Sequence, residues 1–213
     1  MLRHPVDLTC AGRTDTGVHA WGQVVSFDAA EPFDSDATLR ASNKLLAPTI
    51  VIRSIEPAEP GFDARRSAKA RTYRYTVVNR PVPDPFRAAT AWHVEEPLDV
   101  RAMQLTCDPL IGEHDFSSFC RAPRAGNGDN APSMVRKLQA AVWRDLDDGI
   151  LQFEVTSSSF CHQMVRSLVG TMVEVGRGRR RAGEMAGILR AQSRAAAGHL
   201  APPHGLCLWS VRY

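Results

Sequence analysis

The chain has 213 residues, of which 44% are hydrophobic, and it carries a formal net charge of +3 at pH 7. This composition is sufficient for a substantial hydrophobic core and excludes a disordered tail. The sequence contains no apolar run that approaches the length of a membrane span, and we expect a soluble, cytoplasmic protein with one domain or two small ones.

The cysteines are five in number and lie far apart, at Cys10, Cys107, Cys120, Cys161 and Cys207. No two of them form a CxxC pair, and no histidine lies near them at metal-ligand spacing. We therefore expect reduced thiols, as in a cytosolic protein, and no metal site.

The first half of the chain mixes short strands with one helix. A strand is predicted at 6–10 and a β-like run that ends near Phe27. Residues 34–46 read as a helix capped by Asp34 or Ser35, and residues 49–55 as a strand. The segment ARTYRYTVVN (70–79) alternates as a strand, with Tyr73, Tyr75 and Val77 on one face and Arg74, Thr76 and Val78 on the other.

The second half repeats this mixture. Asp99 is predicted to cap a helix, and an Asp-Gly turn at 148–149 predicts a hairpin between two strands. Within 162–176 the apolar residues follow the i, i+3, i+4 spacing of an amphipathic helix, with Gly176 as its C-cap. A helix at 183–192 and a strand at 205–213 close the chain. Strands and helices do not alternate strictly, which favours an α+β fold with an antiparallel sheet.

Two clusters of basic residues, at 64–74 and 176–181, have the composition of a nucleic-acid footprint. Solvated basic loops explain either cluster equally well when it is considered alone. The clusters comprise Arg65, Arg66, Lys69 and Arg71, and Arg177, Arg179, Arg180 and Arg181.

Asp15 lies in the segment CAGRTDTGVHAWGQVVSF (10–27) and is the first candidate for chemistry. One interpretation makes it a turn residue between Gly12 and Gly17. The other makes it a nucleophile that a substrate can reach. Spacing alone favours the turn.

Two further side chains are candidates for a site. Arg166 lies at the edge of the apolar stripe of its helix, where it either reaches water or meets an acid across the fold. If that acid is Asp15, the pair keeps the carboxylate ionised. Tyr73, beside basic residues, is either a core residue or a surface for base stacking. Three other side chains are interpreted as packing residues, namely His19, Phe160 and His162.

In combination, these segments resemble the bacterial tRNA pseudouridine synthase A family along essentially the whole chain. AGRTDTGVHAWGQVVSF (11–27) is similar to the catalytic motif of the family, and FDARRSAKARTYRYTVVNR (62–80) to its second motif. EHDFSSF (113–119), SSFCHQMVRSLVGTMVEVGRG (158–178) and GLCLWSVRY (205–213) match in kind. The resemblance implies that Asp15 is the nucleophile, that Tyr73 contacts the substrate, and that Arg166 is the basic partner of Asp15.

The resemblance also implies a reaction, namely isomerisation of uridine to pseudouridine at positions 38, 39 and 40 of tRNA, with base flipping and no cofactor or metal. Arg13 would hold the flipped state, and the enzyme would be a homodimer. The implied fold has two ferredoxin-like or RRM-like halves that flank a basic catalytic cleft, with an N-terminal subdomain at 1–66 and a C-terminal subdomain at 67–213.

One departure from the family pattern concerns the N-terminus. By this resemblance the chain starts almost on the catalytic strand, without the strand and helix that the family has before it, so that either the start is misassigned and the protein is longer, or this is a truncated form. Two alternatives to an active enzyme follow from the sequence: a non-catalytic RNA-binding module, or an inactive truncated remnant of the same family.

Overall fold

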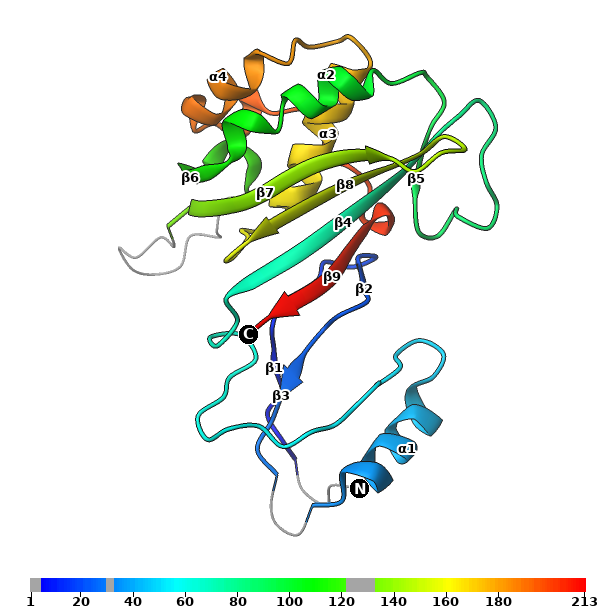
Figure 1. Ribbon diagram of the computed structural model, residues 1–213, viewed down its shortest axis with the longest axis vertical. Coiled ribbons are helices and arrows are strands. Elements are labelled where there is room, and N and C mark those ends of the chain that lie inside the picture. Colours follow the sequence, from blue (N-terminus) through cyan, green and yellow to red (C-terminus); the bar gives the residue numbers. More distant parts are fainter. Residues whose placement is uncertain (1–4, 30–32, 122–132) are drawn as a thin grey trace. The chain divides into compact units, whose positions relative to one another are not determined.

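The structure is a computed structural model and describes residues 5–29, 33–121 and 133–213 (Figure 1). Contacts divide the chain into two compact units. The small unit comprises residues 1–11 and 24–68, and the large unit comprises residues 12–23 and 69–213. The segment with Asp15 thus groups with the large unit. The division at 66/67 and a basic cleft between two halves stay predictions.

In its described residues, 5–11, 24–29 and 33–68, the small unit contains one helix and one pair of short strands. β1 (Thr9–Cys10) pairs antiparallel with β3 (Val25–Ser26). α1 (Ser35–Leu46) begins after Asp34, whose carboxylate accepts a hydrogen bond from the backbone N–H of Ala37 at 2.8 Å. Asp34 is therefore the N-cap, one of the two residues that the sequence indicated.

The strand predicted at 49–55 does not form, and this prediction is wrong. The side-chain amide of Asn43, on α1, donates to the backbone carbonyl of Ile52 at 2.8 Å and accepts from its N–H at 2.7 Å. These two bonds use the backbone groups that a strand partner would need. Ile50 and Val51 are exposed.

The large unit is built on a mixed seven-stranded sheet, which confirms the α+β class. Its order is β2-β9-β4-β8-β7-β6, with β5 paired to β4. The β2–β9 and β4–β5 pairs are parallel, and the others are antiparallel. The strands are β2 (His19–Ala20), β4 (Ala70–Asn79), β5 (Trp92–Val94), β6 (Gly112–Asp115), β7 (Val135–Asp145), β8 (Ile150–Ser157) and β9 (Leu206–Arg212).

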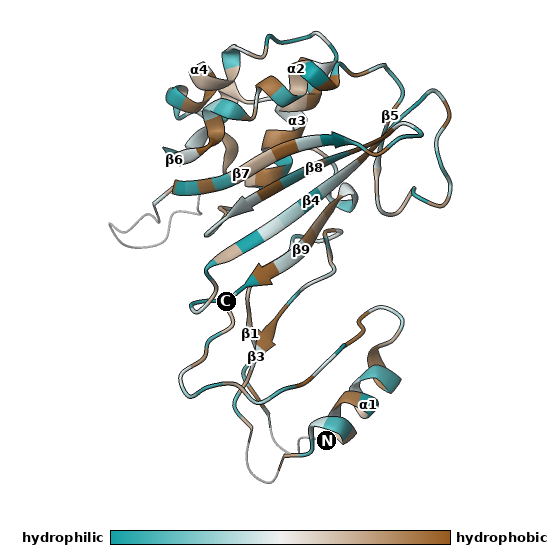
Figure 2. Ribbon diagram, in the orientation of Figure 1, coloured by the Kyte–Doolittle hydropathy of each residue, from teal (hydrophilic) through white to brown (hydrophobic). Residues whose placement is uncertain are grey.

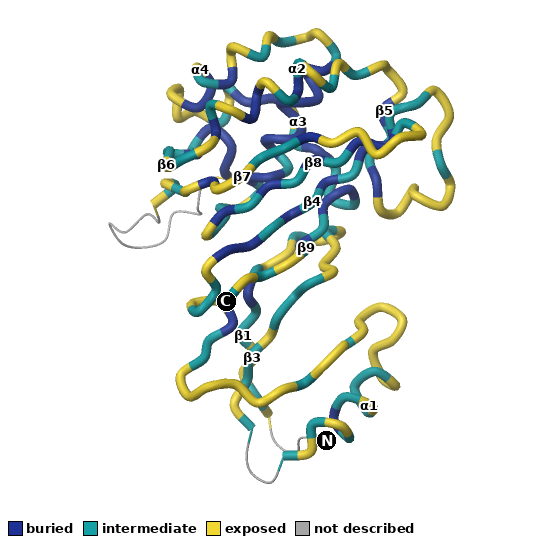
Figure 3. The backbone as a smooth tube through the Cα atoms, viewed as in Figure 1, coloured by how far each residue is buried: buried dark blue, intermediate teal, exposed yellow. Residues whose placement is uncertain are grey.

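Helices cover one face of this sheet (Figure 1). They are α2 (Val100–Leu105), α3 (Met164–Gly176) and α4 (Glu184–Ala191). The apolar character of α3 is visible in Figure 2, and nearly all of this helix is buried in Figure 3. Tyr73, Tyr75 and Val77 of β4 are buried in the core that α3 shares, so the predicted alternation of this strand is confirmed. None of the helices in the described ranges is long and apolar enough to span a membrane.

The helix caps and the hairpin predicted for the second half of the chain are confirmed, with one exception. Asp99 caps α2 by accepting from the N–H of Ala102 at 2.9 Å, and the predicted hairpin is β7–β8. Gly176, however, is the last residue of α3 rather than its cap, and Gly178 takes the positive φ of 72° that follows the helix. A Cβ at 176 would lie 2.5 Å from the sulfur of Met103, so α2 packs closely against the end of α3 at this glycine.

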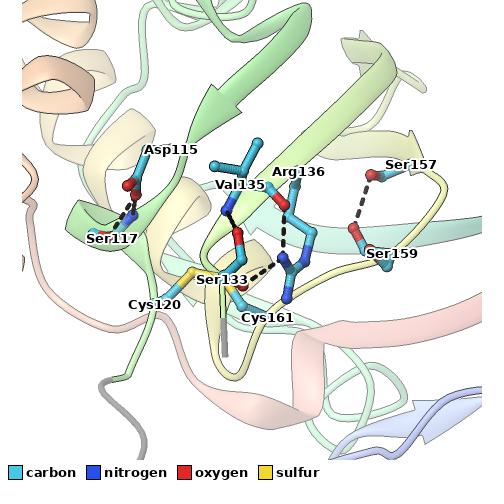
Figure 4. Close-up of a disulfide and its surroundings, with 9 residues drawn as sticks. All are labelled: Asp115, Ser117, Cys120, Ser133, Val135, Arg136, Ser157, Ser159 and Cys161. Atoms are coloured by element: carbon cyan, nitrogen blue, oxygen red, sulfur yellow. Dashed lines mark hydrogen bonds between the residues drawn. A yellow bond between two sulfur atoms is a disulfide. The ribbon is translucent and has the colours of Figure 1, made fainter. Parts of the chain in front are cut away.

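Cys120 and Cys161 form a disulfide, shown in Figure 4. The prediction that all cysteines are reduced is therefore wrong for these two, whereas the remaining three are free thiols. The two residues are 41 positions apart in the chain, and only the packing of the β8–α3 loop against the segment after β6 brings them together.

Candidate active site

The loop that carries Asp15 is closed by its own hydrogen bonds. The side chain of Gln23 accepts from the backbone N–H of Gly12 at 3.3 Å and donates to its carbonyl at 2.6 Å. The carbonyl of Asp15 accepts from the N–H of Val18 at 2.9 Å, and Gly17 takes a φ of 82° within this turn. Asp15 is therefore a turn residue through its backbone, and its carboxylate remains available for other contacts.

Both oxygens of the Asp15 carboxylate have a partner. Oδ2 lies 3.1 Å from Nη1 of Arg166, and Oδ1 lies 3.1 Å from Nε2 of His162. The Asp15 side chain is 27% exposed and that of Arg166 only 11%. The guanidinium thus meets an acid across the fold rather than water, and the acid is the one that the motifs indicated.

Arg166 is held in place by the chain segment that precedes β9. It lies in the first turn of α3, and its Nε donates to the carbonyl of Ala201 at 2.8 Å. The backbone N–H of Ala201 donates in return to the carbonyl of Arg166 at 3.2 Å. The close approach of this segment to α3 requires glycine at position 170, one turn after Arg166, because a Cβ there would overlap the carbonyl of His199. The guanidinium is therefore oriented before any substrate arrives.

Tyr73 lies beside the same loop, with most of its ring in the core. Its side chain is buried and packs edge-on against Phe160, with the ring centroids 5.0 Å apart. A Cβ at Gly12 would lie 3.3 Å from the Tyr73 hydroxyl, so the loop approaches this oxygen closely. Burial raises the pKa of Tyr73 to about 12, and the charge of Asp15 adds to this while Arg71 opposes it. The hydroxyl is therefore neutral near pH 7.

Two histidines that the sequence indicated as packing residues are not packed. The ring of His162 is 50% exposed and contacts Asp15, and the exposed ring of His19 bonds to the carbonyl of Ala89 at 2.9 Å. The interpretation of both as packing residues is therefore wrong. In the sequence, His162 lies four residues before Arg166, and this proximity is the one feature that points to a shared site. The backbone between them is not predictable from spacing, because Gln163 has a φ of 66°.

The structure divides the predicted basic clusters into paired and exposed residues. Arg177 and Arg179 both bond to Glu96, at 2.8 and 2.9 Å, and Arg180 bonds to Glu174 at 2.5 Å. Arg71 is buried and donates to the carbonyl of Ser158 at 2.6 Å. These four arginines thus have partners within the protein, and Arg179 is the most exposed of the three that form ion pairs, with 57% of its side chain exposed. The exposed members of the two clusters are Arg65, Arg66, Lys69, Arg179 and Arg181, and Arg13 is exposed as well.

Among the described residues, no group of three or more His, Cys, Asp or Glu side chains is placed to hold a metal ion. The candidate site consists of a carboxylate on a tight loop, an arginine and a histidine from the start of α3, and a tyrosine from the middle strand of the sheet. Such a carboxylate, reachable and balanced by a fixed positive charge, suits covalent or acid–base chemistry.

Comparison with known proteins defines the class and then the family. The family model for tRNA pseudouridine synthase matches residues 107–213. The tRNA pseudouridine synthase A of Halalkalibacterium halodurans is 44% identical over 202 residues, which cover 94% of this chain and 74% of that protein. The tRNA pseudouridine synthase A of Myxococcus xanthus is 41% identical, and the alignment covers 100% of this chain and 78% of that protein. The corresponding values for the tRNA pseudouridine synthase A of Bacillus subtilis are 39%, 98% and 82%.

The chain therefore belongs to the tRNA pseudouridine synthase family, a family of isomerases, as the motifs predicted.

Proposed function

We propose that this protein isomerises uridine to pseudouridine in tRNA, at positions 38, 39 and 40 of the anticodon stem-loop. The observation that carries the proposal is the contact between Arg166 and the carboxylate of Asp15, which lies on the loop GRTDTGVHA (12–20). In the reaction the bond between N1 and C1′ breaks, the uracil turns, and C5 joins C1′. The C5 hydrogen leaves as a proton and N1 gains one, so that neither a redox cofactor nor a metal is required.

In this proposal Asp15 is the nucleophile, and it bonds transiently either to C1′ of the ribose or to C6 of the base. Arg166 supplies the positive charge that balances the carboxylate and orients it. The target uridine is stacked within the RNA, so it must be flipped out at a cost of a few kcal/mol. Arg13, exposed on the same loop, occupies the vacated space or grips the adjacent phosphate, and Tyr73 contacts the extruded base.

The exposed basic residues supply contacts to the phosphate backbone and most of the non-specific affinity. Because Arg71, Arg177, Arg179 and Arg180 have internal partners, Lys69 and Arg181 are the better candidates within the large unit. We further propose that the protein is a homodimer, and that it works in the cytoplasm, where its tRNA substrate is found.

The test is release of the C5 hydrogen from tRNA labelled at uridine C5. We expect release by the wild-type protein and none by Asp15→Ala or Asp15→Asn. The matched control is Asp148→Asn, which changes a carboxylate that is 83% exposed on the hairpin turn, and it should react like the wild type. Release by Asp15→Asn at the wild-type rate would refute the nucleophile assignment.

The same variants separate an enzyme from a plain RNA-binding module. An acid inside a phosphate-binding site opposes binding, so a module without catalysis should bind tRNA more tightly as Asp15→Ala and release no hydrogen in either form. An enzyme should bind tRNA about equally well in both forms and lose only turnover.

A further inference from the structure

His162 makes a contact that the proposed chemistry of Asp15 does not yet use. Its Nε2 lies 3.1 Å from Oδ1 of the carboxylate, while Arg166 holds Oδ2 at the same distance. A carboxylate oxygen only accepts hydrogen bonds, so a hydrogen bond across this contact is one that an N–H at Nε2 of the imidazole donates.

We propose that His162 is a positioning residue for Asp15, which donates a hydrogen bond from Nε2 to Oδ1 and thereby fixes the plane of the reacting carboxylate. This inference rests on the proposed function.

The need for a second donor follows from the torsional freedom of aspartate. The terminal torsion of an aspartate side chain is broad, because a carboxylate can rotate about its last bond at little cost. One bond from Arg166 to Oδ2 leaves much of that rotation free. A second bond to the other oxygen, from a group on the same α3 entry segment, restricts it and holds the carboxylate in one attacking orientation.

The backbone around His162 is anchored firmly enough for this role. Arg71 binds the carbonyl of Ser158 at the start of the β8–α3 loop, and the backbone N–H of Arg121 donates to the carbonyl of His162 at 2.9 Å. The neighbouring Cys161 is linked covalently to Cys120, as Figure 4 shows. The loop is therefore tied at three points, and the ring is presented from a fixed backbone.

The exposure of His162 distinguishes positioning from packing. Half of the side chain is exposed, and it is not part of the buried core, so its removal leaves no cavity. Asp15 itself remains 27% exposed and reachable beside the ring. We therefore expect substitutions of His162 to change turnover with little effect on folding.

The test compares His162→Ala with His162→Gln in steady-state C5-hydrogen release. We expect His162→Ala to lower kcat by about 10- to 100-fold, with the KM for tRNA and the melting temperature nearly unchanged. Glutamine carries an amide N–H at a reach similar to that of Nε2, so His162→Gln should recover a large part of the lost kcat. The matched control is His199→Ala, because His199 contacts the carboxylate of Glu174 on the same helix, away from Asp15. It should keep the wild-type kcat.

Three outcomes would overturn the inference: a wild-type kcat for His162→Ala, a His162→Gln variant no faster than His162→Ala, or a raised KM with kcat unchanged. A measurement without turnover separates this inference from the proposed function. Nitrogen NMR of the imidazole should show a proton on Nε2 of His162 and a changed Nε2 signal in Asp15→Asn. A ring protonated only on Nδ1 would overturn the positioning role, whether or not the wild-type protein releases C5 hydrogen. Failure of the wild-type protein to release C5 hydrogen would count against the proposed function instead.

Discussion

Asp15 and Arg166 lie 151 positions apart in the chain, and their charged groups meet at 3.1 Å at the start of α3. The guanidinium bonds at the same time to the carbonyl of Ala201, so it links the Asp15 loop, α3 and the segment before β9. We therefore expect both turnover and stability to depend on this one side chain.

Arg166→Ala should abolish turnover and destabilise the protein. The substitution leaves the Asp15 carboxylate without its main positive partner and the Ala201 carbonyl without a donor. We expect the free energy of unfolding to fall by roughly 1–3 kcal/mol, the usual cost of unpaired polar groups that are mostly buried. Urea unfolding measures this loss. Arg181→Ala removes an exposed arginine and should unfold like the wild type, whereas equal stability of both variants would contradict the central role of Arg166.

The folded protein should lose stability at alkaline pH. Burial raises the pKa of Tyr73 from 10 to about 12 and that of the Cys107 thiol from 9 to about 12. It also raises the pKa of Tyr75. The unfolded chain therefore releases these protons first. The stabilisation is complete below about pH 9 and is lost progressively as the pH rises to about 12.

Thermal melts between pH 8 and 11 measure this loss, and Tyr73→Phe should show a shallower decline above pH 10, since it removes one of the groups. If the melting temperature of Tyr73→Phe declines with pH as steeply as that of the wild type, the Tyr73 hydroxyl of the wild-type protein ionises normally in the folded state.

The salt dependence of tRNA binding should separate exposed from paired basic residues. Lys69→Ala and Arg181→Ala should each reduce the slope of log K against log salt by about 1, the contribution of one phosphate contact. Arg180→Ala should leave this slope unchanged and lower stability instead, because Glu174 loses its guanidinium partner. Filter binding at several salt concentrations measures the slopes, and equal slopes for all three variants would remove the distinction.

The disulfide predicts a simple count of reactive thiols. Alkylation of the denatured, non-reduced protein should label only Cys10, Cys107 and Cys207, and all five cysteines after reduction. The double variant Cys120→Ser/Cys161→Ser should lose about 2–4 kcal/mol of stability, the usual effect of removing such a cross-link. Labelling of five cysteines before reduction would show that the pair is reduced, as is usual in the cytosol.

Local patterns predicted much of the large unit. The alternation at 70–79, the Asp-Gly hairpin and the apolar spacing of α3 each depend on residues a few positions apart, and all three elements form. The strand expected at 49–55 failed because Asn43, on a neighbouring helix, takes the backbone groups of Ile52. Periodicity does not report such competition from a side chain.

The sequence by itself determined the motifs that contain Asp15 and Arg166 and the family to which they belong, because these depend on residue types in order along the chain. Only the tertiary structure decided that His162 contacts Asp15, that Cys120 and Cys161 pair, and that four arginines of the predicted basic clusters have partners within the protein. The reason is physical: apart from the Arg180–Glu174 pair, these contacts join groups from segments far apart in the chain, and their distance is set by how the sheet and α3 pack rather than by spacing along the sequence.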